Sequence, residues 1–228
     1  MSANIPVAVA PSIKRPGLYL SVNLTAGASS PGTARLRALI ISPKTSAGTI
    51  TADSGFKEAI SGKDEARTLW GPGAQGHLAA VRLFDRFGTA LVDGVAPAVS
   101  AGVAAAGSFI MTGTPTSTCV FRVWIHAVPF VWQWLVGETP NQARAKIIAL
   151  VNAATDSVHV TLATHATAGK VTVTAKTAGL HGNDIRMNFE QLSGDGGSVA
   201  TIVQLTGGTL EPDLTAVLAL VQQRKYDI

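Results

Sequence analysis

The sequence predicts an α+β fold: a β-rich domain with one capped helix, attached to a smaller mixed α/β domain and an extended N-terminal arm. Two runs dense in Val, Ile, Phe and Trp, at 120–127 and 129–136, predict neighbouring buried strands. A segment with a full set of helix-start signals follows at 140–154. Several prolines near the N-terminus prevent a helix there, which predicts the arm.

Residues 1–30 are expected to form the extended N-terminal arm. Pro6, Pro11 and Pro16 interrupt any helix in this region. The segment 18–22 combines aromatic and β-branched residues and predicts one strand within the arm.

Residues 31–110 are expected to form the first part of the smaller α/β domain. The apolar run 36–41 predicts a buried strand, and apolar residues at near-helical spacing followed by Gly88 predict a helix at 76–87. The other expected elements are a helix at 54–60, a strand at 89–92 and a linker of small residues at 97–115.

Residues 111–208 are expected to form an inserted β-rich domain, and residues 209–228 a helix that returns to the smaller domain. Trp124, Trp132 and Trp134 lie in the two apolar strands and are expected to stabilise its core through their large area. Further strands are expected at 158–163, 170–176, 183–190 and 198–206, and the terminal helix at 214–223.

The helix at 140–154 has the clearest start signals in the chain. Thr139 is placed to cap it, Pro140 occupies the first helical position and Gln142 completes a capping box. We expect Ala143, Ile147, Leu150, Val151 and Ala154 to form its buried face.

Composition argues against several classes of function. The 228 residues carry 14% charged side chains, against roughly 25% in an ordinary soluble domain. The formal net charge of +4 is spread along the chain without a dense basic block, so we expect no nucleic-acid partner. The single cysteine, Cys119, excludes an intrachain disulfide framework. No signal peptide is recognised, and no segment is apolar enough to predict membrane insertion.

The segment 71–76, of sequence GPGAQG, has the glycine spacing of a dinucleotide-binding loop, with Asp93 about twenty residues further on. A Rossmann loop must follow a buried parallel strand, but the segment 64–70 is too polar to be one. Pro72 also removes a backbone donor from the phosphate cradle. We therefore interpret the segment as a loop and helix start, with a nucleotide-dependent enzyme as a minor alternative.

No other pattern predicts catalysis, a metal or a cofactor. The histidines, at 77, 126, 159, 165 and 181, lack metal-site spacing, although His159 and His165 flank one strand and could be neighbours. No serine occurs in a nucleophile-elbow context. The segment 177–184, rich in glycine and followed by a strand, is interpreted as a hairpin loop. We expect no enzymatic activity, no catalytic residue, no metal and no cofactor.

Several segments, taken in order, resemble the N-terminal portion of contractile phage tail sheath proteins of the Mu-like kind. They are RPGLYL at 15–20, GPGAQG at 71–76 with its helix, the strand-helix-strand unit at 120–163, VTVTAK at 171–176, the residues Gly179 and 182–185 (GNDI), and the helix leading into YDI at 226–228.

The resemblance implies a structural subunit of a virion or prophage tail, not an enzyme. In this family subunits stack as hexameric rings around a tail tube, and contraction of the helical assembly drives the tube through the host envelope for genome ejection. The implied partners are further sheath copies, the tail tube protein, the baseplate and the tail terminator, with assembly in the host bacterial cytoplasm. The β-rich unit would be an outward-projecting domain.

The resemblance also implies that terminal arms exchange strands with neighbouring subunits. Residues 14–24 have the character of such an arm, and Leu18, Tyr19, Leu20 and Val22 are the expected exchange residues. Family members are longer, so we expect this chain to be a fragment of a longer protein. A β-rich binding module, such as an adhesin or a carbohydrate-binding domain using Trp124, Trp132 or Trp134, stays open as the alternative function.

Overall fold

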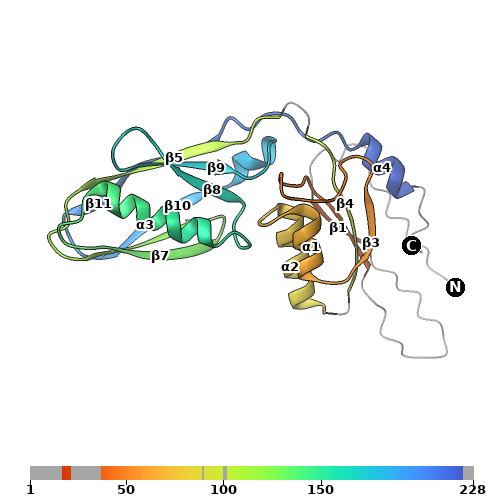
Figure 1. The fold of residues 1–228 in the computed structure, drawn as a ribbon, viewed down its shortest axis with the longest axis horizontal. Helices are drawn as coiled ribbons and strands as arrows, with labels where there is room; N and C mark the ends of the chain where they lie inside the picture. Colours follow the sequence, from red (N-terminus) through yellow and green to blue (C-terminus); the bar gives the residue numbers. More distant parts are fainter. Residues whose placement is uncertain (1–16, 22–36, 89, 100–101, 223–228) are drawn as a thin grey trace. The chain divides into compact units, whose positions relative to one another are not determined.

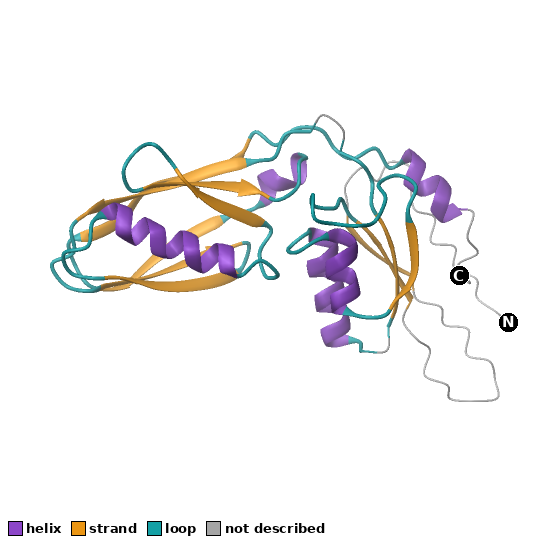
Figure 2. Cartoon of the chain, viewed as in Figure 1, coloured by secondary structure: helices purple, strands orange, loops and turns teal. Residues whose placement is uncertain are grey.

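The computed structural model describes residues 17–21, 37–88, 90–99 and 102–222 (Figure 1). The chain divides into two compact units, which we call unit 1 (Met1–Ser100 with Glu211–Ile228) and unit 2 (Ala101–Leu210). Both units combine helices with sheets (Figure 2), which confirms the α+β fold class. The assignment of these units to a sheath domain and an outer domain stays a prediction.

Unit 1 contains a four-stranded sheet in the order β1-β2-β4-β3. Its strands are β1 (Gly17–Ser21), β2 (Arg37–Ile41), β3 (Phe56–Ile60) and β4 (Leu91–Val95). β2 and β4 are parallel, whereas β1 and β3 pair antiparallel to their neighbours. The strands predicted in the arm, at 36–41 and near 89–92 are therefore confirmed.

Helices cover both faces of this sheet. On one face, α1 (Lys63–Trp70) and α2 (Gln75–Arg86) bury Trp70, Ala80 and Leu83 against Ile40 and Val92. On the other face, α4 (Thr215–Gln222) buries Val217 against Ile41 and Val95. The predicted helices at 76–87 and 214–223 are confirmed.

The helix predicted at 54–60 is wrong, because this segment is the edge strand β3. Ala59 has a φ of 48°, and the β3–β4 register shifts between Lys57 and Ile60. Pairing with β4 decides the conformation, an effect of tertiary context that local propensity does not contain.

Unit 2 contains two antiparallel sheets, in the orders β10-β6-β7 and β11-β5-β9-β8. The first comprises β6 (Cys119–Ile125), β7 (Val128–Trp134) and β10 (Met187–Ser193). The second comprises β5 (Ala106–Gly113), β8 (Val160–Thr164), β9 (Lys170–Ala175) and β11 (Gly197–Thr206). A 3-10 turn, η1 (Leu180–Asp184), lies between β9 and β10 where a simple hairpin loop was expected.

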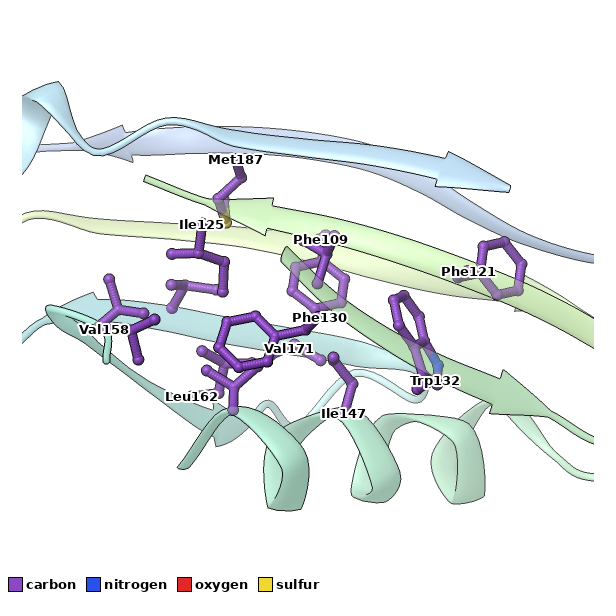
Figure 3. Packing of buried hydrophobic residues seen from close by; sticks show 14 of the residues in the cluster. Phe109, Phe121, Ile125, Phe130, Trp132, Ile147, Val158, Leu162, Val171 and Met187 are labelled. Carbon is purple, nitrogen blue, oxygen red and sulfur yellow. The ribbon is translucent and has the colours of Figure 1, made fainter. Parts of the chain in front are cut away.

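Both sheets and α3 (Pro140–Ala153) contribute to one core in unit 2. Phe109 from β5, Trp132 from β7, Val171 from β9 and Ile147 from α3 converge in it (Figure 3). The predicted capping box of α3 is confirmed, since Gln142 N–H donates to Thr139 Oγ1 at 3.3 Å and Thr139 N–H donates to Gln142 Oε1 at 2.8 Å. The predicted buried face is correct for Ala143, Ile147 and Val151, whereas Leu150 is 37% exposed.

The prediction of a linker over the whole of 97–115 is wrong, because Ala106–Gly113 form strand β5. Its residues alternate between buried and less buried positions from Ala106 to Thr112, but Ala106, Gly107 and Ser108 at the start of the strand hide the pattern. Gly107 shows why small residues are needed, because a Cβ there would lie 2.6 Å from Val203 O of β11. Small residues here allow close strand contact and do not mark a flexible connection.

No helix in the described part of the chain is long and apolar enough to cross a bilayer.

Candidate assembly site

Strand β1 contains three of the four residues predicted to exchange between subunits. Leu18, Tyr19 and Leu20 pair with Ile40, Leu39 and Ala38 of β2 in the same chain. Val22 lies outside the described residues. Among the described strands, β1 lies at one end of the sheet order and pairs with β2.

The opposite edge of the same sheet is poorly suited to accept another strand. β3 is short and bulged, and the Ala59 N–H donates to Asp93 Oδ1 within the sheet at 2.9 Å. Lys57 on this strand forms an ion pair with Glu65 at 2.7 Å. Bulges and charged side chains protect an edge strand from pairing with another chain. The β3 edge is therefore a poor template for strand addition.

A buried carboxylate joins three strands of this sheet. Asp93 on β4 is 2% exposed, and its Oδ2 accepts hydrogen bonds from Arg37 Nε at 3.0 Å and from Arg37 Nη2 at 2.8 Å. Its Oδ1 accepts from Ala59 of β3. Sequence reasoning considered Asp93 only as a ribose ligand and missed this pair, because nothing in the spacing relates residues 37 and 93.

The glycine-rich segment 71–76 makes room for a buried tryptophan. It follows helix α1 and not a strand, which confirms that it is not a Rossmann loop. Trp70 is fully buried, and a Cβ at Gly76 or Gly94 would lie 2.8 Å or 2.4 Å from its indole ring. Gly71 has a φ of 86°, and a Cβ there would lie 2.0 Å from Thr45 Oγ1. Gly71, Gly76 and Gly94 thus serve the packing of α1, α2 and β4.

The histidines are dispersed, with one exception. No group of three metal-ligating side chains occurs among the described residues. His77 accepts the Gly73 N–H within α2's first turn, and His126 lies in the β6–β7 turn. His159 lies next to His181, with ring centroids 5.9 Å apart, while His165 accepts the Thr167 N–H.

The tryptophans of unit 2 are mainly core residues. Trp132 and Trp134 are 5% and 0% exposed, which confirms their predicted place in the core. Trp124 is half-buried, and the Arg122 guanidinium lies 5.3 Å from its ring centroid. Binding of a sugar by stacking needs an accessible ring face, which the buried Trp132 and Trp134 do not offer. Of the three tryptophans, Trp124 is then the remaining candidate for the carbohydrate-binding alternative.

Two ion pairs lie near the starts of helices α1 and α3. The Lys57 ammonium, with the Ser61 backbone and hydroxyl groups, lowers the pKa of Glu65 from 4.5 to about 2. The Lys146 ammonium and the Leu135 N–H lower the pKa of Glu138 in the β7–α3 loop. The neighbouring ammonium and N–H groups stabilise both carboxylates in their ionised form, which indicates a structural role.

Comparison with known proteins identifies a relative with the expected character. The chain is 28% identical, over 221 aligned residues, to the Mu-like prophage FluMu tail sheath protein of Haemophilus influenzae. The alignment covers 94% of this chain and 43% of that protein, so the chain spans less than half of the relative's length. No family model matches the chain. The match confirms the resemblance to Mu-like tail sheath proteins.

Proposed function

We propose that this chain is the N-terminal portion of a structural subunit of a contractile phage tail sheath. The subunit polymerises as stacked hexameric rings around a tail tube, and contraction drives the tube through the host envelope. The observation that carries the proposal is the similarity to the FluMu tail sheath protein along 94% of the chain. The packing role of the glycine-rich loop adds support, because it accounts for the glycine pattern without a nucleotide.

In this proposal the subunit meets further copies of itself, the tail tube protein, the baseplate and the tail terminator. It acts in the virion tail after assembly in the host bacterial cytoplasm, without a cofactor or catalytic step. A heterologous contact between copies whose rotation does not close generates a helical tube, as a sheath requires.

Strand β1 is the proposed link between neighbouring subunits. It pairs with β2 of its own chain through one antiparallel ladder. Residues 22–36 separate the two strands, and a chain of that length spans at most roughly 50 Å when extended. The same ladder can therefore form with β2 of a neighbour, with Leu18, Tyr19, Leu20 and Val22 moving together. Main-chain hydrogen bonds of this kind tie subunits while rigid bodies rotate.

The test is sedimentation of the complete gene product carrying Tyr19→Pro and Leu20→Pro. In an antiparallel pair, consecutive residues point their N–H groups to opposite sides. The double variant therefore removes at least one bond to β2, because proline lacks the N–H. We expect wild type to sediment as large polymers and the double-proline variant to remain in small species.

The matched control is the double variant Tyr19→Ala and Leu20→Ala, which keeps both N–H groups. We expect it to polymerise more than the proline variant, since the ladder is intact. Polymers formed equally well by the proline variant would exclude β1 as the link. Small species from the wild-type product would argue against the sheath function itself.

A further inference from the structure

A turn in unit 2 holds together the two segments through which the chain enters and leaves that unit. Gly179 N–H donates to Val103 O at 3.1 Å, and Leu180 N–H donates to Leu210 O at 3.0 Å. Asn183 Oδ1 accepts from Gly208 N–H at 2.8 Å, while its Nδ2 donates to Gly208 O at 3.1 Å. The 177–184 turn is thus bonded to both ends of unit 2.

Close packing in and around this turn leaves little room for side chains at its glycines. A Cβ at Gly208 would lie 2.4 Å from Gly179 O, and one at Gly182 would lie 2.8 Å from Ala105 Cβ. A Cβ at Gly179 would lie 2.7 Å from His181 Nδ1. The glycines that made this segment conspicuous in the sequence therefore let the turn contact the two ends directly.

A chain of three polar side chains lies under the turn. The Thr177 hydroxyl oxygen is 2.8 Å from His159 Nε2 and 2.6 Å from His181 Nε2. The hydroxyl has one proton, so one imidazole accepts from it while the other donates to it. His159 and Thr177 are 4% and 5% exposed, so water does not replace these bonds.

Protonation of His181 is unfavourable in this arrangement. Its Nδ1 is buried, and no described residue offers it a hydrogen-bond partner. With Nε2–H donating to Thr177, a cationic ring would carry a further N–H on Nδ1, and a buried donor without an acceptor destabilises the folded state. Burial accordingly lowers the pKa of His181, although the Asp184 carboxylate opposes this effect.

The neighbouring elements offer few charged groups that could stabilise a protonated His181. Lys176, next to Thr177, donates to Thr155 O at 2.6 Å, and its pKa is lowered by burial in spite of Asp156. β11, which packs on η1, and β5 contain no titratable side chain, and neither do residues 102–105 or 206–210. The next charged residue after 206–210 is Glu211, and the next after Asp184 is Arg186. Asp184 is thus the carboxylate that acts on His181.

We propose that the His159–Thr177–His181 chain is a pH-sensitive lock on the two ends of unit 2. With neutral imidazoles the 177–184 turn stays bonded to Val103, Gly208 and Leu210. Protonation of His181 favours an open turn in which the ring reaches water, and the ends of unit 2 are released. The lock belongs to unit 2 alone and does not depend on the sheath proposal.

The test is amide hydrogen exchange of the whole chain at pH 7.5 and 5.5, corrected for the intrinsic pH dependence of exchange. We expect peptides covering 102–106, 177–185 and 206–211 to open up to about tenfold more at pH 5.5. That limit is the ratio of protonated to neutral imidazole one unit below an ordinary pKa of about 6.5. Peptides from β6 and β7 serve as the internal reference and should not change.

His181→Gln keeps an N–H that can donate to Thr177 but cannot gain a proton. We expect its protection to be equal at the two pH values, whereas His126→Asn, in the exposed β6–β7 turn, should keep the wild-type response. Equal protection of the wild type at both pH values, or an unchanged pH response in His181→Gln, would overturn the proposal. If the variant does not fold, NMR titration of wild-type His181 decides: a pKa at or above the ordinary value contradicts the lock.

Discussion

At the residue scale, the fit of Trp70 between two glycines determines the packing of unit 1. We expect Gly94→Ala to destabilise the protein by about 1–3 kcal/mol, because its Cβ would overlap the fully buried indole. Urea unfolding measures the change. Gly62→Ala is the matched control, since nothing lies within 4 Å of a Cβ at that position. Equal stability of Gly94→Ala and wild type would show that the indole does not occupy this site.

The carboxylate of Asp93 is the second residue on which unit 1 depends. Asp93→Asn removes the negative charge that pairs with the Arg37 guanidinium and puts an amide where the Arg37 and Ala59 donors converge. We expect a loss of about 1–3 kcal/mol in the free energy of unfolding, the range for a hydrogen bond to a charged group. Thermal and urea unfolding check it. An unchanged unfolding midpoint would mean that the ladder alone holds β2, β3 and β4 together.

Among the elements, the β6–β7 hairpin contains a turn that lacks the residues which usually indicate one in a sequence. His126 and Ala127 both have positive φ, at 47° and 68°, without glycine or asparagine at either position. Replacing them by Asn and Gly supplies the residues that a type I′ turn favours. We expect the double variant to be more stable by about 1 kcal/mol, the order of the left-handed penalty for one residue. A lower melting temperature would contradict this turn geometry.

Sequence reasoning worked best where an element carries its own signals. Helix α3 was predicted with its cap because Thr139, Pro140 and Gln142 are local. It failed where contacts with neighbouring strands determine the conformation. Examples are β3, which pairs with β4, and β5, whose small residues fit against β11. For the candidate site, the strand character of β1 was readable from its composition, but its partner β2 and the Asp93–Arg37 pair depend on tertiary contacts.

At the scale of the whole molecule, acid should act in two separate pH ranges. Because the pKa of Glu65 is lowered from 4.5 to about 2, the unfolded chain binds more protons between these values, and stability is lost as the pH falls through them. Glu138 and Asp213 have lowered pKa values too and act in the same sense. His181 acts at higher pH, because its stabilisation declines once the pH drops below an ordinary histidine pKa of about 6.5.

Unfolding free energy measured from pH 8 to 3 should therefore show two declines. His181→Gln should abolish the upper decline, while Glu65→Gln should weaken the lower one only modestly, since exposed ion pairs contribute little. A single decline centred near pH 4 in the wild type would show that the histidine chain does not affect stability.

We propose that this chain belongs to a subunit which polymerises into a tail sheath. The most direct measurement is negative-stain electron microscopy of the complete gene product, with the 228-residue chain prepared in parallel. We expect striated hollow tubes from the complete product. Dispersed particles from the complete product, under conditions in which it is folded, would contradict the sheath function.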